Sequence, residues 1–211
     1  MTIDDETTLL ALGGSLTDEP SADGRVARGQ RTRRRVAEAL VSLLAKGEPD
    51  PTAKAIAVEA GVSLRLVFHH FTDMDDLYCA VAFLQLEEQR AVLPALTSSL
   101  PLPHRIHDAV QRRGTFYEEI SPVRRAAVRR AVSSPGVGAI IAVGNSLLAD
   151  GLATLFSPEL QPRAEEDRDA LLAALDSATS WEAWERMRQG AGLSSETARL
   201  VMTRTLAALL S

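Results

Sequence analysis

Six arginines between residues 25 and 35 form the most concentrated block of positive charge in the chain. No acidic residue separates them, and they follow a stretch, residues 1–24, that carries six acids and no base. Attraction between cations and nucleic-acid phosphates is local and is screened beyond about 10 Å. A basic block on a protein of net charge -5 is therefore compatible with a small DNA-contacting head, although a solvated helix start would carry the same charges.

The segment from Pro51 to Phe71 has the pattern of two short helices joined by a tight turn. Thr52 and Ser63 are typical N-cap residues, and apolar side chains recur at helical spacing after each of them. Gly61 stands where the turn needs a residue in the left-handed conformation. Two short helices joined by such a turn form a helix-turn-helix, whose second helix fits the major groove of DNA.

The exposed residues of the second helix, together with the basic block, are the candidate DNA contacts. Arg65 could donate two hydrogen bonds to a guanine edge, or could contact only a phosphate. Thr52 could serve only as a cap, and one of the two histidines could pack beside Phe71 instead. Basic residues upstream could reach a neighbouring groove, as basic arms do. The predicted contacts are Arg28, Arg31, Arg33, Thr52, Ser63, Leu64, Arg65, Phe68, His69 and His70.

The remaining chain has helical periodicity throughout, and we predict an all-α fold. No stretch alternates with period two for long enough to form a strand. Glycine and proline residues mark the gaps between the expected helices, which lie near residues 25–46, 52–59, 63–69, 73–93, 103–119, 122–133, 136–156, 164–189 and 195–210. The predicted organisation is a disordered acidic arm over 1–24, a helix-turn-helix head over 25–80 and a helical domain over 81–211.

A block of about fifty residues resembles the DNA-binding head of TetR-family transcriptional regulators. The matching positions are Ile56-Ala57-x-x-Ala60-Gly61-Val62-Ser63, Phe68-x-x-Phe71 and Asp75-Asp76-Leu77, and the stretch from Arg33 to Gly47 resembles the family's first helix. The resemblance implies a homodimeric regulator, expected to be a repressor, that binds a duplex DNA operator and is released from it by a small-molecule effector.

Two positions depart from the family pattern. Phe68 and Met74 stand where the family usually has a tyrosine and a lysine that contact phosphate. Each lost phosphate contact would weaken binding at every sequence and lower the salt dependence. The alternative interpretation is therefore a helical ligand-binding or interaction protein that has lost strong DNA binding.

The resemblance also implies an effector pocket and a dimer interface in the domain after the head. We expect an apolar or mixed effector, and the candidate pocket residues, each of which could be plain core, are Phe83, Leu86, Phe116, Tyr117, Ile120 and Ile141. The last two helices carry wide apolar faces that could form a four-helix interface or ordinary core. The candidate interface residues are Leu171, Leu175, Trp181, Trp184, Val201 and Leu206.

Catalytic and metal-binding patterns are missing from the sequence, so we predict neither an enzyme nor a metal site, and no cofactor. His104 and His107 share a helix face but have no companion ligands at suitable spacing, and Cys79 is expected to be a buried apolar residue. A single cysteine, an acidic N-terminus unlike a signal peptide, and no run of about 18 apolar residues predict a cytoplasmic protein with no membrane partner.

Overall fold

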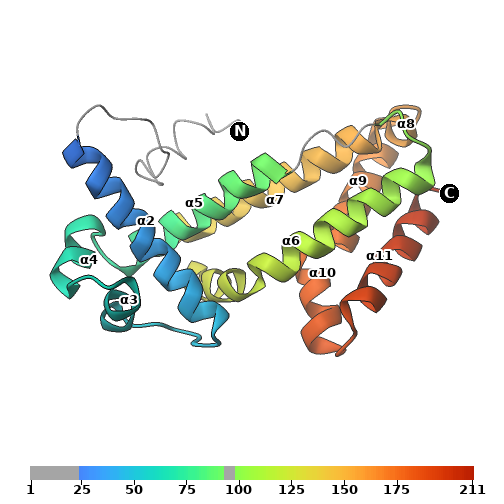
Figure 1. Cartoon of the computed structure of the whole chain (residues 1–211). Coiled ribbons are helices and arrows are strands. Elements are labelled where there is room, and N and C mark those ends of the chain that lie inside the picture. The colour runs from blue at the N-terminus through green and yellow to red at the C-terminus, as the bar shows by residue number, and fades with distance from the viewer. Residues whose placement is uncertain (1–23, 93–97) are drawn as a thin grey trace. The chain divides into compact units, whose positions relative to one another are not determined.

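The computed structural model describes residues 24–92 and 98–211, and side chains are described for 27–85 and 98–211 (Figure 1). Every regular element in these ranges is a helix, so the predicted all-α fold is confirmed. The acidic arm predicted over 1–24 lies outside the described residues, apart from Gly24, where the first described helix begins.

The chain packs as two compact units that interleave in sequence. Among the described residues, the first comprises 24–88 together with Pro122–Val143, and the second comprises 89–92 and 98–121 together with Gly144–Ser211. Helices α6 (Leu102–Ala131) and α7 (Pro135–Leu155) each run from one unit into the other. The predicted domains meet between residues 80 and 81. The observed units differ, because the end of α6 and the start of α7 pack with the helix-turn-helix in the first unit.

Four helices of the first unit precede α6. They are α2 (Gly24–Ala45), α3 (Ala53–Ala60), α4 (Leu64–His70) and α5 (Met74–Val92), close to the predicted bounds. Apolar residues at helical spacing turn one face of each helix inward. The buried side chains that hold these helices together include Leu40, Ile56, Val67, Phe71, Leu77 and Val81.

Gly61 closes the turn between α3 and α4 in the left-handed conformation, with φ +63° and ψ +39°. Its N–H donates to the carbonyl of Val58 over 3.1 Å, and the N–H of Val62 donates to the carbonyl of Ala57 over 2.9 Å. These two bonds satisfy carbonyls that the end of α3 would otherwise leave unpaired. The predicted role of Gly61 is thus confirmed by its backbone geometry.

Gly61→Ala is expected to lower the free energy of unfolding by about 1–2 kcal/mol, because a side chain in the left-handed region costs about that much. The added Cβ would also lie 3.4 Å from Nη2 of Arg35. Thermal denaturation followed by circular dichroism measures the change. Gly151→Ala is the control, since a Cβ at that helical position meets nothing within 4 Å and should not lower the melting temperature. Equal melting temperatures for wild type and Gly61→Ala would contradict the prediction.

Two predicted helix boundaries are wrong. A break at Ser121-Pro122 was expected, but α6 continues through Pro122, because the proline removes only one backbone hydrogen bond while packing on both sides holds the helix. One helix was expected over 164–189, but the chain breaks at Ser180, which is extended and caps the next helix through Ala183 N–H. The observed elements are α9 (Glu165–Thr179), α10 (Trp181–Glu185) and the π-helix η1 (Arg186–Gly190).

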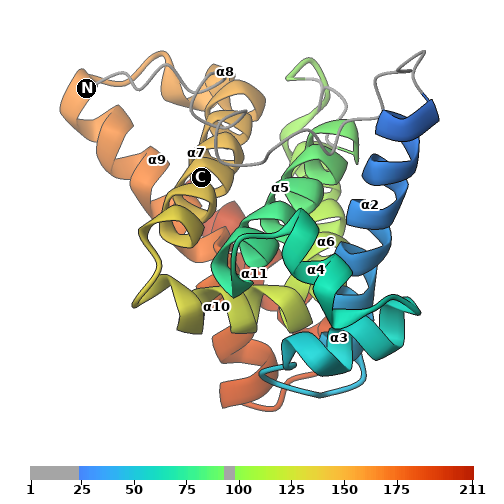
Figure 2. The ribbon, with the colours of Figure 1, turned by 90° about the vertical axis from the view of Figure 1, so that its left-hand side faces the viewer.

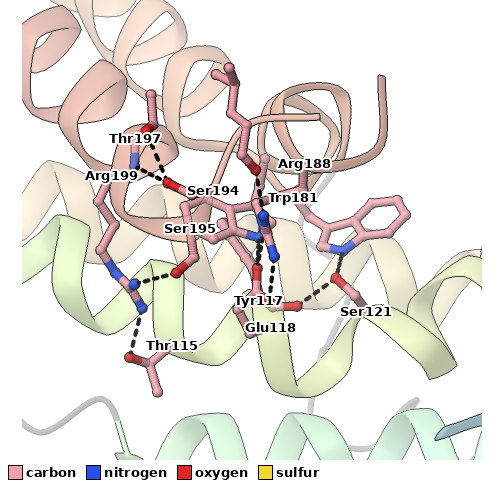
Figure 3. A network of polar contacts seen from close by, with 12 residues as sticks. Thr115, Tyr117, Glu118, Ser121, Trp181, Arg188, Ser194, Ser195, Thr197 and Arg199 are labelled. Atoms are coloured by element: carbon pink, nitrogen blue, oxygen red, sulfur yellow. Dashed lines mark hydrogen bonds and ion pairs between the residues drawn. The ribbon is translucent and has the colours of Figure 1, made fainter. Parts of the chain in front are cut away.

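The second unit is completed by α8 (Ser157–Leu160) and α11 (Ser195–Leu209). Its buried core includes Tyr117, Phe156, Leu175, Trp184, Met202 and Leu206. Polar contacts at the edge of this core join α6 to α10 and η1 (Figure 3). Trp181 Nε1 donates to Ser121 Oγ over 3.0 Å, and Arg188 Nε donates to Glu118 Oε1 over 2.7 Å. The last helices are thereby fixed against α6.

Among the described residues, one helix, α7, is long and apolar enough to cross a membrane by length and composition alone. The core helix of a soluble protein, which is mostly buried, passes the same test, whereas 22% of this apolar window is buried. Polar side chains at Asn145, Ser146 and Asp150 are exposed on it. Its buried apolar side chains pack within the two units and are Val137, Ile140, Leu148, Leu152 and Leu155.

A buried ion pair in the second unit makes stability depend on pH. Arg105 Nη1 donates to Glu159 Oε2 over 2.6 Å, and this bonding holds the pKa of Glu159 below its ordinary value of 4.5. A carboxyl with a lowered pKa contributes stability above its unfolded pKa, and that stability is lost as the pH falls through the folded pKa. The melting temperature should therefore fall below about pH 4.5, and less steeply in Glu159→Gln, which cannot ionise. Identical slopes in both proteins would count against the pair.

Candidate nucleic-acid interface

Helix α4 presents one face outward and one face to the core of the first unit. Val67 is buried, whereas Leu64 is 42% exposed and Phe68 is 50% exposed, and Arg65 and His69 are exposed as well. Spacings of three and four residues place 64, 65, 68 and 69 on the same side of a helix. Figure 2 shows α4 in the first unit together with α2 and α3, which the helix contacts.

Thr52 and Ser63 hold the first turns of α3 and α4. Thr52 Oγ1 accepts a hydrogen bond from Ala55 N–H, and Ser63 Oγ accepts one from Leu66 N–H, both over 3.2 Å. Both residues are exposed. Because each cap uses the hydroxyl oxygen as an acceptor, the hydroxyl hydrogen remains able to donate to a phosphate oxygen.

Arg33 joins three helices of the first unit, and its predicted role as a DNA contact stays a prediction. Its Nη1 donates to the carbonyl of His70 over 2.7 Å, and its Nη2 donates to Asp76 Oδ1 over 3.3 Å. Its guanidinium also lies 4.4 Å from the ring centroid of Phe71. These contacts hold α2 against the end of α4 and the start of α5.

His70 faces the same cluster and is half-buried, unlike His69. Burial lowers the pKa of His70, and the nearby charges of His69 and Arg33 act in the same direction. A lowered pKa keeps the imidazole neutral near pH 7, so His70 adds no positive charge to the surface. The predicted alternative in which one histidine packs beside Phe71 stays a prediction, and His70 is the more buried of the two.

The other predicted cations of the head are exposed. Arg28 and Arg31 lie on the exposed side of α2, and Arg65 forms no hydrogen bond or ion pair with any described residue. The candidate contacts omitted one further exposed base, Lys54, and gave Arg35 of the basic block no role of its own. Lys54 is exposed in the first turn of α3, where a base beside the N-cap was the available signal. Arg35 Nη2 donates to the carbonyl of Ala60 over 2.6 Å and braces the turn before α4.

The end of α6 is bonded to the rest of the first unit. Arg130 Nη1 donates to Asp75 Oδ1 over 2.6 Å, and its guanidinium lies 4.4 Å from the ring centroid of Tyr78. Arg129 Nη2 donates to the carbonyl of Pro49 over 2.7 Å, in the loop before α3. A shift of this end of α6 would therefore disturb contacts both before α3 and after α4.

The described structure gives no support for thiol chemistry at Cys79 or for a metal site at His104 and His107. Burial raises the pKa of the Cys79 thiol to about 11, so the thiol is protonated and unreactive at neutral pH. In the part of the chain that the structure describes, no group of three or more His, Cys, Asp or Glu side chains is arranged to hold a metal ion.

The candidate pocket residues fall into different units. Phe83 and Ile141 belong to the first unit, whereas Phe116, Tyr117 and Ile120 pack in the second. The side chain of Leu86 lies outside the described residues. Tyr117 is fully buried and so is a core residue rather than an open pocket wall.

Five of the six candidate interface residues lie in the buried core of the second unit, as the alternative of ordinary core expects. They are buried within the chain because α9, α10 and α11 pack their apolar faces on α6 and on one another. The five are Leu171, Leu175, Trp181, Trp184 and Leu206. Val201 is 40% exposed on α11, beside Leu200, which is 48% exposed.

A narrow cavity of about 30 Å³ lies in the second unit between α6 and α7. Its walls are apolar except for two arginines on α6. The lining residues are Ala109, Arg112, Arg113, Leu147, Leu148, Gly151, Leu152 and Leu155.

The described helices combine a helix-turn-helix in the first unit with a second helical unit. No family model matches the chain, and no curated protein matches it in sequence. Solved structures do match it in fold.

The chain is similar to a TetR-family transcriptional regulator of Mesorhizobium loti at 19% identity, over 87% of this chain and 96% of that one, with a TM-score of 0.66. It is similar to a TetR-family regulator of Rhodococcus at 15% identity, over 86% and 100%, with a TM-score of 0.67. It is also similar to the multidrug binding protein EbrR, complexed with imidazole, at 19% identity, over 82% and 93%, with a TM-score of 0.57. The chain therefore has the fold of TetR-family transcriptional regulators.

Proposed function

We propose that this protein is a cytoplasmic, homodimeric transcriptional regulator, a repressor that binds duplex DNA through α4 and is released by a small-molecule effector. It acts by binding and not as an enzyme. The observation that carries the proposal is the outward face of α4, where Arg65 stands between two exposed apolar side chains behind a capped N-terminus.

The composition of that face indicates which base edges it would recognise. A guanidinium suits the O6 and N7 acceptors of guanine, whereas apolar side chains suit the methyl group of thymine. Arg65 is therefore assigned to a guanine, and Leu64 and Phe68 to neighbouring thymines. In a dimer, two such half-sites would lie about one helical turn apart.

Selection from a random duplex library with the full chain tests the proposal. We expect enriched sites with two half-sites that each contain guanine beside thymine. The enriched duplex should bind at least about a thousandfold more tightly than a scrambled duplex, as specific sites usually do. Failure to enrich any sequence would reject DNA recognition.

A helical ligand-binding protein that has lost strong DNA binding is the second candidate. Phe68 has no hydroxyl to donate to a phosphate, and Met74 is half-buried against the core of the first unit, so no cation stands there. Band shifts at about 50 and 200 mM salt separate the candidates, because phosphate contacts make affinity fall steeply with salt. The second candidate predicts no complex at the higher salt concentration.

For the homodimer we propose the exposed face of α11 as the interface. Leu200 and Val201 are large apolar side chains exposed on it, and Ala207 and Ala208 continue the exposed apolar surface two turns further on. Apolar groups exposed together on a helix are typical of surfaces that a partner covers.

Leu200→Glu combined with Val201→Glu should convert the dimer to a monomer, because buried unpaired carboxylates oppose association. Sedimentation velocity measures the mass, and circular dichroism checks that the helices remain. Val132→Glu is the control, since Val132 is 89% exposed in the first unit. A double variant that stays dimeric would exclude this face.

A further inference from the structure

Arg113 is a buried cation that has no carboxylate partner among the described residues. The residue is 6% exposed on α6. Its Nη1 donates to the carbonyl and to Oγ1 of Thr179, both over 2.9 Å, and its Nη2 donates to the carbonyl of Leu148 over 2.6 Å. A fourth contact, 3.3 Å long, joins Nη1 to Tyr117 Oη. All four acceptors are uncharged, although buried charges are usually paired with an opposite charge.

These contacts fix the guanidinium without neutralising it. Tyr117 Oη donates to the same Thr179 carbonyl over 2.8 Å, so the acceptors are themselves held in place. A guanidinium offers five N–H groups, and the four contacts all come from Nη1 and Nη2. Nε takes part in none of them, which leaves it able to donate to an incoming acceptor.

Asp176 on α9 is the acidic residue that Arg113 influences most clearly. Burial raises the pKa of Asp176, and the opposing attraction of Arg113 does not reverse that shift. No hydrogen bond joins the two side chains in the described part of the chain. Asp176 is therefore not a paired counterion for Arg113.

The same arginine lines the narrow cavity between α6 and α7. Arg112 lines it too, and the opposite wall is built from Leu147, Leu152, Leu155 and the backbone of Gly151. The cavity thus combines a cationic end with an apolar wall. With a volume of about 30 Å³, the cavity encloses only a group about the size of one water molecule beside the guanidinium, and it is open to solvent where Gly151 is exposed, so the chain of a ligand would lie along α7 outside it.

We propose that this cavity binds a small organic monocarboxylate, with the carboxylate on Arg113 and a short apolar chain along α7. A carboxylate supplies the missing negative charge and matches the fork of a guanidinium, whereas an alcohol lacks the charge and an amine has the wrong sign. The inference rests on the effector-binding part of the proposed function and names the chemical class of the effector.

The test measures ligand binding to the full chain by isothermal titration calorimetry, without DNA. Butyrate should bind and raise the melting temperature, whereas 1-butanol and butylamine at the same concentration should do neither. Equal binding of the three compounds, or no binding of acetate, propionate or butyrate, would overturn the proposal.

Variants locate the site. Arg113→Met should weaken butyrate binding at least tenfold, but it also removes core hydrogen bonds, so a second variant leaves that network intact. Gly151→Leu places a side chain at the exposed rim of the cavity, where a Cβ meets nothing within 4 Å, and should obstruct entry and abolish binding. Thr154→Leu adds a comparable side chain at an exposed position on the same helix and should bind as wild type does. A folded Gly151→Leu protein with wild-type affinity would reject the site.

The two proposals fail separately. Wild-type protein that enriches a DNA site but binds no carboxylate would reject the effector class and leave the regulator function standing. Protein that binds butyrate but enriches no DNA would reject the regulator and leave the cavity assignment standing. If both proposals hold, addition of butyrate to the protein–DNA complex should lower the affinity for DNA.

Discussion

Arg65→Ala should weaken binding to the selected duplex about 5- to 150-fold, because a guanidinium that donates two hydrogen bonds to guanine contributes about 1–3 kcal/mol of discrimination. Arg65 is exposed on α4 and makes no other polar contact in the described part of the chain, so its removal should leave the fold unchanged. Fluorescence anisotropy titrations with the selected duplex and with a duplex carrying adenine for guanine measure the effect. The variant should no longer distinguish the two duplexes.

Arg163→Ala is the matched control for this variant. It removes the same charge from an exposed position of the second unit, where Arg163 Nε donates only to the carbonyl of Glu159. It should bind both duplexes as wild type does. If Arg65→Ala instead weakened binding to both duplexes equally and lowered the salt slope by about one, Arg65 would contact a phosphate and not a base.

Trp184→Ala should cost about 3–5 kcal/mol of the free energy of unfolding, which corresponds to a fall of about 6–20 °C in melting temperature. Trp184 is fully buried, its ring centroid lies 6.2 Å from that of Tyr117, and its Nε1 donates to Glu118 Oε1 over 3.0 Å. A Cβ on Gly114 would lie 3.1 Å from Trp184 Cη2, so the indole packs closely against α6. Removal of the ring leaves a cavity that these neighbours cannot fill.

The Trp184→Ala variant also distinguishes a core role for Trp184 from a role in a dimer interface. A residue of a dimer interface, when truncated, would give monomers that keep the helicity and melting temperature of the wild-type monomer. The packing of Trp184 predicts loss of helical structure in the second unit instead. Val132→Ala, at an exposed site, should change stability by less than about 0.5 kcal/mol. A helical, fully stable Trp184→Ala monomer would contradict the core assignment.

The helix-turn-helix could be predicted almost to the residue because its signals are local. Thr52 and Ser63 cap the helices through their own side chains, and Gly61 takes the one conformation that other residues avoid. Each of these features depends on neighbours within four residues in the chain. Sequence reasoning therefore places α3, the turn and α4 correctly.

Roles that depend on distant partners could not be predicted. Arg31 and Arg33 look alike in the basic block, but only Arg33 meets Asp76 and the carbonyl of His70, which lie about forty residues away. The apolar faces of the last helices predicted burial correctly, but the pattern is the same whether the partner is α6 or a second chain. Helix boundaries also depend on packing that the local sequence does not reveal. Pro122, a strong helix breaker, lies inside α6, whereas α9 ends just before Ser180, a residue that does not usually break a helix.

The most direct test of the account places a photo-cross-linking residue on α4. p-Benzoylphenylalanine at position 68, where the native side chain is half exposed, should cross-link to the bases of the selected duplex on irradiation. The same group at position 132, which is more exposed, should give little or no cross-link. Cross-linking from position 132 and none from position 68 would show that DNA meets another surface, and the role assigned to α4 would be wrong.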